Sequence, residues 1–334
     1  MLGDILLTTP LLKKIRNLLP FARIDYLVEE RFVETLAANP HIDNLLVFRE
    51  GKDKGPGMLR YFRRFISKKY DLVIDLHGGP RSAMMTAISL AEHRIGYCRS
   101  LRGRLAYNYQ ILDDGLERHS IDKGLRILEA FGVFEGSERA LPLFHLKESV
   151  RNQMAGILEV KGVKDKKMLL IHPGSAWPYK RWRTERFAAF ADQMADHHPV
   201  QVVLTEGAGE NLVQDIENRM SHRVSILIDL GIQALGALIS RADLFICHDS
   251  GPMHMASALN IPTVALFGPS KVVNWKPRSA DAVVVRAKLP CCPCKQKKCG
   301  RPEDYCMDTI SVPEVLKAAE GLLQKEPALN GRNN

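Results

Sequence analysis

The feature that most constrains the fold is a regular alternation of short apolar runs and helical patterns in the second half of the chain. Apolar runs lie at residues 168–172, 200–205, 224–228, 244–247 and 263–267, and helical patterns separate them at residues 182–197, 209–220, 232–240 and 252–259. Repeated strand, helix, strand units form parallel sheets with helices on both faces, because their crossovers are right-handed. The pattern therefore predicts a doubly wound α/β lobe.

The first half of the chain shows the same alternation in a looser form. Residues 5–20 carry apolar side chains at helical spacing, β-like runs follow at residues 23–28, 45–48, 70–77 and 94–97, and a helix is expected at residues 121–131, closed by Gly132. The 334 residues are about twice the ~150 of an average domain. We therefore expect two lobes with a cleft between them, at residues 1–150 and 166–326, and a disordered tail at residues 327–334.

Composition and charge exclude several classes of protein. The chain is 46% hydrophobic and 25% charged, which is ordinary globular composition. Its apolar runs are far shorter than the ~18 residues of a membrane-spanning helix, and an acid at Asp4 argues against a secretory signal. The cytosol is the expected location, and there the seven cysteines would be thiols or metal ligands rather than disulfides.

The net charge of +9 favours anionic partners: nucleic acid, phosphorylated lipid headgroups or nucleotide phosphates. Basic residues are spread along the chain, including runs at residues 99–104 and 295–298, and aromatic residues make up only 7%. The regular interleaving of a base-stacking surface is missing. The charge pattern therefore weighs against nucleic acid.

Two predicted strands end in segments rich in small, polar and charged residues. The first of these segments is His172-Pro173-Gly174-Ser175, followed by Lys180-Arg181-Trp182. Ligands of open α/β sheets bind beyond the carboxyl ends of strands, where helix amino termini present free N–H groups. Small residues let the backbone approach a phosphate, Ser175 can donate its hydroxyl, and Lys180 supplies a point charge. A loop that merely carries a surface lysine is the alternative.

The second of these segments is the run from Cys247 to Ala256, CHDSGPMHMA. Asp249 or Ser250 suits a helix cap and Pro252 a first helical position, so part of this sequence is explained by helix initiation alone. Capping does not explain His248 and His254. A strand end rich in His, Asp, Ser and Gly favours a polar ligand.

Two further segments that contain carboxylates have two interpretations each. Glu206 and Glu210 follow the apolar run at residues 200–205, where an acid could hold a ribose hydroxyl, or Glu210 could simply favour a helix amino terminus. Asp4 stands before the first helical pattern, as a cap or as a carboxylate on the floor of the cleft. The chain has neither Gly-x-Gly-x-x-Gly nor a P-loop motif, which argues against a dinucleotide oxidoreductase and a P-loop nucleotidase.

Taken together, these segments resemble glycosyltransferase family 9, the ADP-heptose:lipopolysaccharide heptosyltransferases, and most closely the second-heptose type. The resemblance rests on GDILLTTP at residues 3–10, DLVIDLHG at 71–78, HPGS at 172–175 with KRW at 180–182, DSGPMH at 249–254 and ALFGPS at 265–270. It implies the GT-B architecture of two Rossmann-like lobes, with the nucleotide sugar held mainly by the second lobe and the acceptor by the first.

The resemblance also implies a reaction: inverting, metal-independent transfer of heptose from ADP-heptose to the inner core of lipopolysaccharide, without a cofactor, at the cytosolic face of the inner membrane. Asp4 would be the base that takes the acceptor proton. The charge of the departing ADP would be met by Lys180, Ser175 and the N–H groups of the helix that begins after Gly251. The other implied contacts are Asp249 to sugar hydroxyls, Ser250 and His254 in the donor loop, Glu210 to the ribose, and Thr8 and Thr9 to the acceptor.

Two alternatives to this reaction stay open at this point. The chain could be a family member that uses another nucleotide sugar or another acceptor. It could also be a two-lobed protein that closes on an anionic ligand without chemistry. Release of ADP only in the presence of acceptor would favour the enzyme.

Two features depart from a simple reading. Members of the family begin with an apolar strand ahead of the Gly-Asp pair, and Met1 stands close to Gly3 here, so the first strand of the N-terminal lobe is expected to be missing and the natural protein to be longer. Losing such a central strand would cost on the order of 10 kcal/mol. The second feature is a group of five cysteines, which could supply thiolates to a metal or stay reduced, although their spacing is not that of a zinc ribbon: Cys291, Cys292, Cys294, Cys299 and Cys306.

Overall fold

The computed structural model describes residues 1–50, 52–53, 56–97, 101–134, 139–163, 166–294, 299–301 and 305–325. The chain divides into an N-terminal unit, Leu7–Ala140, and a C-terminal unit, Leu141–Asn334 together with Met1–Leu6. The predicted tail at residues 327–334 and the basic run at residues 295–298 lie outside the described residues, as does most of the side-chain detail of the run at residues 99–104. No helix in the described part of the chain is both long and apolar enough to cross a bilayer.

The division between the units comes earlier in the chain than the boundary predicted between residues 150 and 166. The reason is helix α7 (Glu148–Val160). Its Met154 and Leu158 are buried in an apolar core of the C-terminal unit, together with Phe144 from the segment before the helix. Apolar burial of this kind assigns the whole segment from Leu141 to the C-terminal unit.

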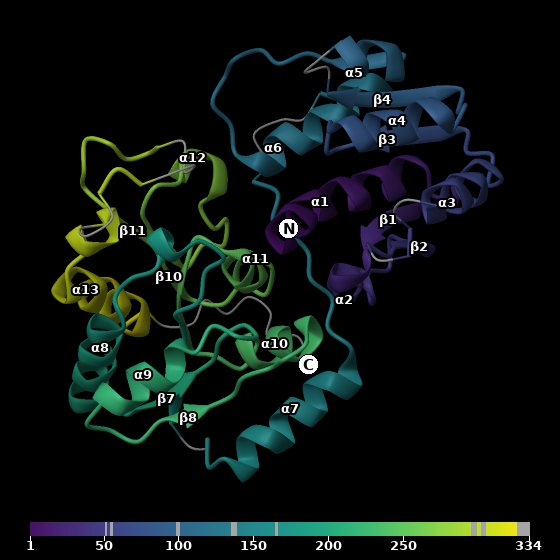
Figure 1. The fold of residues 1–334 in the computed structure, drawn as a ribbon. Coiled ribbons are helices and arrows are strands. Elements are labelled where there is room, and N and C mark those ends of the chain that lie inside the picture. Colours follow the sequence, from purple (N-terminus) through teal and green to yellow (C-terminus); the bar gives the residue numbers. More distant parts are fainter. Residues whose placement is uncertain are drawn as a thin grey trace. The chain divides into compact units, whose positions relative to one another are not determined.

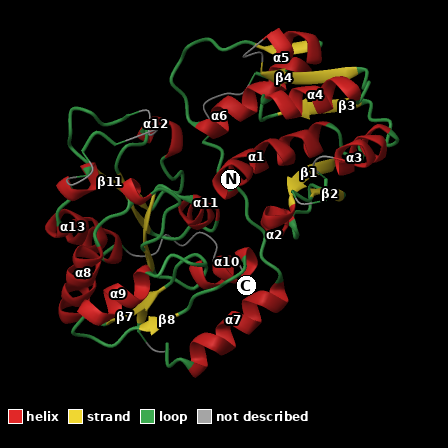
Figure 2. Cartoon of the chain, in the orientation of Figure 1, coloured by secondary structure: helices red, strands yellow, loops and turns green. Residues whose placement is uncertain are grey.

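The C-terminal unit is built on one six-stranded parallel sheet, which confirms the predicted doubly wound lobe (Figures 1 and 2). The strands are β6 (Lys167–His172), β7 (Val200–Leu204), β8 (Ser225–Ile226), β9 (Leu244–His248), β10 (Thr263–Phe267) and β11 (Ala282–Arg286), in the order β11-β10-β9-β6-β7-β8. The helices after α7 are α8 (Thr184–His197), α9 (Leu212–Arg219), α10 (Ile232–Ile239), α11 (Gly251–Ala258), α12 (Val272–Trp275) and α13 (Val312–Leu323), with 3₁₀ turns η3 (Pro178–Lys180) and η4 (Cys306–Thr309).

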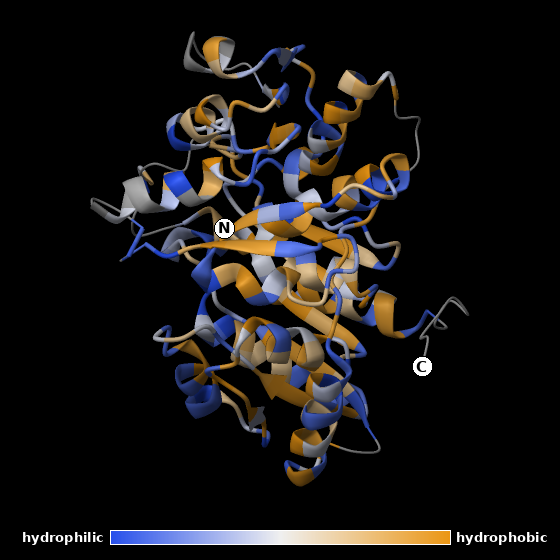
Figure 3. Cartoon of the chain, turned by 90° about the vertical axis from the view of Figure 1, so that its right-hand side faces the viewer, coloured by the Kyte–Doolittle hydropathy of each residue, from blue (hydrophilic) through white to orange (hydrophobic). Residues whose placement is uncertain are grey.

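Both faces of this sheet are buried, which explains why its strands read as continuous apolar runs. Successive side chains alternate between the faces, so Leu169 and Ile171 of β6 join one core while Leu170 joins the other. The first core includes Phe187 of α8, and the second includes Met255 of α11. The strands of this sheet are mainly orange, the hydrophobic end of the scale, in Figure 3.

The N-terminal unit carries two small parallel sheets, β1-β2 and β3-β4-β5, rather than one continuous sheet. Its strands are β1 (Asp25–Glu29), β2 (Asn44–Phe48), β3 (Leu72–Asp75), β4 (His93–Tyr97) and β5 (Tyr109–Ile111). Its helices are α1 (Leu2–Leu18, whose first residues belong to the C-terminal unit), α2 (Val33–Leu36), α3 (Pro56–Ile66), α4 (Pro80–Ile88), α5 (Leu101–Ala106) and α6 (Ser120–Leu125), with 3₁₀ turns η1 (Glu30–Phe32) and η2 (Arg126–Phe131). The described part of this unit is therefore also of the α/β class, but its strands form two separate sheets.

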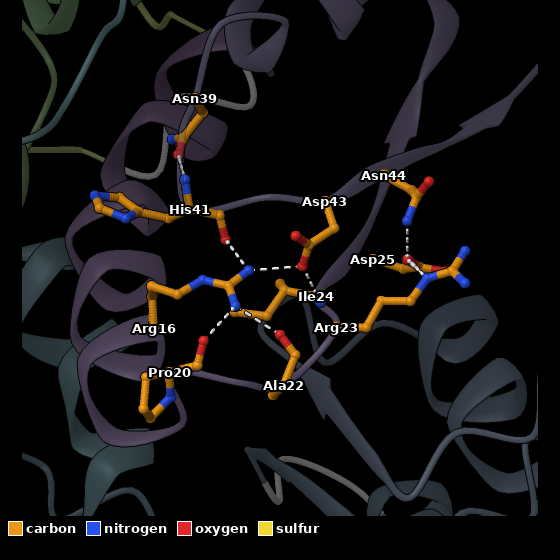
Figure 4. Close-up of polar contacts among 10 residues, drawn as sticks. All are labelled: Arg16, Pro20, Ala22, Arg23, Ile24, Asp25, Asn39, His41, Asp43 and Asn44. Carbon is orange, nitrogen blue, oxygen red and sulfur yellow. Dashed lines mark hydrogen bonds and ion pairs between the residues drawn. The ribbon is translucent and has the colours of Figure 1, made fainter.

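The end of α1 is fixed by one guanidinium, as Figure 4 shows. Arg16 donates from Nη1 to the carbonyl oxygens of Pro20 and Ala22, and from Nη2 to the Asp43 carboxylate at 2.6 Å. Asp43 also accepts the Ile24 N–H at 2.7 Å, which positions the start of β1. The network lowers the pKa of the Asp43 carboxyl, first through the Ile24 N–H and then through Arg16.

Three predicted element bounds change in the structure. The helix expected at residues 121–131 becomes α6 followed by the 3₁₀ turn η2, and it ends, as predicted, at Gly132 in the left-handed region (φ 71°). The helix expected from Trp182 begins only at Thr184. Gly3 and Asp4 were expected in a loop before the first helix, but both lie in the first turn of α1.

Candidate active site

The candidate site lies at the point where the strand order of the C-terminal sheet reverses. From β6, the chain continues outward through β7 and β8 on one side, and β9, β10 and β11 follow on the other. The crevice outside the carboxyl ends of strands at such a reversal is the usual ligand site of doubly wound sheets. The loop after β6 (residues 173–183) and the turn after β9 (residues 249–250) both leave the sheet here.

An ion pair joins these two loops. Lys180 donates from Nζ to Oδ2 of Asp249 at 2.9 Å, and both side chains are largely buried, with exposed fractions of 12% and 9%. The structure thus brings together the two residues that the sequence predicts as the phosphate and sugar contacts. A buried pair of this kind is costly to break from one side, because the remaining charge is left without a partner.

His248, at the end of β9, holds the β6 loop in place. Its Nε2 accepts the Trp182 backbone N–H at 2.8 Å, and its Nδ1 lies 3.4 Å from the carbonyl oxygen of Gly174. These partners fit a neutral ring with the proton on Nδ1. Burial lowers the pKa of His248 to about 3, so the ring stays neutral at physiological pH. Its role in the structure is to join β9 to the loop, which neither the capping nor the ligand interpretation of the motif included.

Helix α11 begins at Gly251 and points its amino terminus at the same crevice. Ser250 occupies the capping position, as the sequence allowed, but its side chain makes no capping hydrogen bond; its Oγ donates instead to the His248 carbonyl oxygen at 3.3 Å. Pro252 follows Gly251 within the first turn. The first N–H groups of α11 therefore receive no cap from the Ser250 side chain, and a helix amino terminus is suited to an anion.

A second guanidinium organises the other side of β6. Arg181 donates from Nε and Nη2 to the carbonyl oxygen of Ser175 (2.9 and 2.7 Å) and from Nη2 to Oε1 of Glu210 (2.9 Å). A Cβ atom on Gly174 would meet Oε2 of Glu210, so a larger residue there would displace this carboxylate. Ser175 is buried. The structure therefore places Ser175 and Glu210 together, held by a residue to which the sequence assigned no separate role.

Glu206, rather than Glu210, caps the amino terminus of helix α9. Its Oε2 accepts the N–H groups of Leu212 and Val213, the first residues of α9. That is the role that the sequence offered to Glu210, which instead pairs with Arg181. Glu210 is therefore the acid that stays beside the loops of the site.

The segment that carries Asp4 lies against His254 within the C-terminal unit. A Cβ atom on Gly3 would lie 2.8 Å from Cδ2 of His254, and Leu2 packs against Gly251. Asp4 itself is 55% exposed and lies 3.1 Å from the terminal amino group. Burial lowers the pKa of His254 to about 4, although Asp249 and Asp4 both oppose the shift. Gly3, the residue before the predicted base, therefore lies against the predicted donor-loop histidine.

The two predicted acceptor residues belong to the N-terminal unit. Thr8 shares a hydrogen bond with the Tyr26 hydroxyl at 3.0 Å. Thr9 is fully buried, so its side chain packs inside the structure rather than facing an acceptor. Thr8, which is only partly buried, keeps the better position for contact with another molecule.

The cysteine group does not form a metal site in the described residues. No three His, Cys, Asp or Glu side chains among them are placed to hold a metal ion, and the described cysteines are free. Burial, followed by the neighbouring Cys306 thiol, raises the pKa of Cys292 to about 12. Cys292 is therefore a protonated thiol at neutral pH, and a protonated thiol is a poor nucleophile.

Known proteins are similar to this chain in sequence and in fold. The family model described as glycosyltransferase family 9 (heptosyltransferase) matches residues 58–303. Lipopolysaccharide heptosyltransferase 3 of Escherichia coli K12 is 28% identical over 99% of this chain and 98% of its own length. The crystal structure of the glycosyl transferase family 9 from Veillonella parvula DSM 2008 superposes with a TM-score of 0.84 and 28% identity, covering 98% of this chain and 95% of that one. The structure of E. coli heptosyltransferase WaaC with ADP gives a TM-score of 0.74 at 16% identity, covering 96% and 97%.

The parallel sheet, the loaded switch point and these matches define the chain as a glycosyltransferase of the GT-B fold. It belongs to glycosyltransferase family 9, the heptosyltransferases. The resemblance seen in the sequence is thereby confirmed, and so is the enzyme class.

Proposed function

We propose that this enzyme transfers heptose from ADP-heptose to the inner core of lipopolysaccharide, with inversion at the anomeric carbon and without a metal ion, at the cytosolic face of the inner membrane. The observation that carries the proposal is the pairing of Lys180 with Asp249, two residues ahead of the amino terminus of α11, which Ser250 does not cap with its side chain. Full-length similarity to a lipopolysaccharide heptosyltransferase supports the acceptor class. The fold shared with a heptosyltransferase solved with ADP agrees with the donor.

In the proposed reaction the leaving group is ADP, and its developing negative charge needs partners that are already in place. Lys180 supplies a cation, and the free N–H groups at the start of α11 supply the positive end of a helix dipole. These groups would do at the diphosphate what a metal ion does in other transferases. The Ser175 hydroxyl adds a further donor on the same loop.

Lys180 has to serve the diphosphate while Asp249 serves the sugar. In the structure the two neutralise each other at 2.9 Å. A bound diphosphate would compete with the Asp249 carboxylate for the Lys180 ammonium group. The Asp249 oxygens would then be free to accept hydrogen bonds from the hydroxyl groups of the sugar. Glu210, which Arg181 holds on the β7 side of β6, would accept hydrogen bonds from the ribose hydroxyls.

The remaining step is removal of the proton from the acceptor hydroxyl. Asp4 is the proposed base, because its carboxylate is exposed and the residues before it, Leu2 and Gly3, lie against Gly251 and His254. The hydroxyl oxygen would attack the anomeric carbon from the face opposite ADP, and its proton would pass to Asp4. His254, neutral in its buried position, would contact the donor rather than transfer the proton.

The test is a panel of donors and acceptors, with ADP release as the readout. We expect ADP release from ADP-heptose only when heptose-deficient lipopolysaccharide is present, and a product of inverted anomeric configuration. Release from a different nucleotide sugar, or with a different acceptor, would replace the proposed substrates while keeping the family. Full activity after exhaustive chelation is expected, and its loss would remove the metal-independent part.

A further inference from the structure

The loop that carries Lys180 displays an aromatic pair that none of the roles above uses. Trp177 is 46% exposed, in a loop whose first residues, Pro173 to Ser175, are buried. Its ring stacks on Tyr179, with centroids 5.8 Å apart and planes 23° from parallel. Aromatic rings carry large apolar faces that gain free energy when covered, so an exposed indole at a substrate site is an available contact surface.

The loop is anchored on both sides of this pair, so the pair is held in place without being buried. On one side, Arg181 binds the Ser175 carbonyl oxygen. On the other, Trp182 donates its backbone N–H to His248 and its Nε1–H to the carbonyl oxygen of Ile310 at 2.9 Å. Of the two tryptophans in this loop, one is an internal anchor and the other is presented at the surface.

The backbone places Trp177 beside the predicted diphosphate contact. The Lys180 N–H donates to the Trp177 carbonyl oxygen at 2.9 Å, within the single 3₁₀ turn η3. Lys180 pairs with Asp249, after β9, whereas Glu210 follows β7 on the other side of β6. Ribose and base would therefore extend toward β7, and a sugar joined directly to the diphosphate would stay near Lys180.

We propose that Trp177, supported by Tyr179, is a stacking platform for the C–H face of a sugar ring. The proposal rests on the proposed function, because it takes Lys180 as the diphosphate contact. The ring belongs either to the nucleotide-sugar donor or to the sugar of the acceptor that approaches it. Both present the same chemistry, an apolar ring face edged by hydroxyls, which suits an amphipathic aromatic side chain.

The experiment compares Trp177→Ala and Trp177→Phe in the full chain, with Phe21→Ala as the control, because Phe21 is a fully exposed aromatic residue of the N-terminal unit. Trp177→Ala is expected to raise the KM of one sugar substrate at least about fivefold with less than about a twofold change in kcat. Trp177→Phe should stay within about twofold of the wild type, since a flat ring remains. The substrate whose KM rises identifies the stacked ring.

Two results would overturn the platform. The first is that the KM values of Trp177→Ala for donor and acceptor both stay within twofold of the wild type. The second is that Trp177→Ala weakens the binding of ADP, which carries no heptose, by the same factor as it raises the KM. A fluorescence titration separates this failure from that of the proposed function. The chain has three tryptophans, and Trp182 is buried. Indole emission should change with ADP-heptose or with acceptor, but not with ADP, and Trp177→Phe should abolish the change. If the wild type releases no ADP in any assay, the proposed function fails while this titration still decides the platform.

Discussion

The two units solve the problem of building an α/β layer differently. The C-terminal unit has one six-stranded sheet with both faces buried, and its strand ends carry buried charged and polar groups. The described N-terminal unit has sheets of two and three strands, and most residues of β1 and β2 are only partly buried. A rigid sheet can hold charges such as Lys180 and Asp249 in a fixed arrangement. The contrast shows that the buried ion pair of the candidate site lies in the unit with the larger sheet, which is buried on both faces.

The largest effect is expected from the charge at the switch point. Lys180→Ala should lower kcat by about a thousandfold, the upper range for losing one group that stabilises developing charge. The measurement is ADP release at saturating donor and acceptor. Because the substitution also leaves Asp249 buried without its partner, the unfolding free energy should be followed in parallel.

The double variant Lys180→Met with Asp249→Asn separates the two causes, since it removes both charges. It should recover stability but not activity. If activity returns in the double variant, Lys180 acts only by neutralising Asp249. The C-terminal unit would then not supply a cation to the leaving group, and the difference between the two units would not bear on catalysis.

The next largest effect is acid sensitivity of the C-terminal unit. Burial holds the pKa of His248 at about 3 and that of His254 at about 4, well below the ordinary value of about 6.5. Below pH 6.5 the unfolded chain binds protons that the folded chain does not, so stability is complete above pH 6.5 and falls as the pH drops toward 4. Each histidine contributes a slope of about 1.4 kcal/mol per pH unit.

Urea unfolding between pH 7 and pH 4 measures this slope. His254→Gln should reduce it by one histidine's share. His222→Gln, which removes a ring exposed at the surface beside Asp192, serves as the control. A slope that His254→Gln leaves unchanged would show that this ring is protonated in the folded state.

The N-terminal unit offers a smaller effect that should leave the donor untouched. Tyr107 donates its hydroxyl to Oδ2 of buried Asp75 at 2.6 Å. Tyr107→Phe should lower the unfolding free energy by about 2 kcal/mol, the usual contribution of a hydrogen bond to a charged group. Affinity for ADP, measured by titration calorimetry, should not change. Tyr109→Phe, at an exposed neighbouring ring, should alter stability by less than about 0.5 kcal/mol.

The smallest effect is expected from Arg181, which positions Ser175 and Glu210, two of the residues proposed to bind the nucleotide sugar. Arg181→Lys keeps the cation but loses the planar fork that reaches both Ser175 and Glu210. The KM for the nucleotide sugar should rise about tenfold, or about 1.4 kcal/mol, with a smaller change in kcat. Arg183→Lys is the matched control, because Arg183 pairs with Asp308 instead. Equal KM values in both variants would assign Arg181 to folding alone.

The sequence predicted the succession of strands and helices in the C-terminal unit, because hydrophobic periodicity and the length of apolar runs are local properties of the chain. Continuous apolar runs can only be buried strands when helices alternate with them. It was less successful at the junctions. The alternation placed Asp4 ahead of the first helix, whereas Asp4 lies inside α1, since helix ends depend on which neighbours cover the first turn.

By itself, the sequence determined the α/β class, the family and the strand ends where charges would gather, because residue type and spacing are enough to fix those. Only the tertiary structure decided which charges pair: Lys180 with Asp249, Arg181 with Glu210, and His248 with the Trp182 backbone. These partners are 69, 29 and 66 residues apart in the chain. No local pattern encodes such a pairing, since it arises only when the parallel sheet brings the ends of β6, β7 and β9 to one edge.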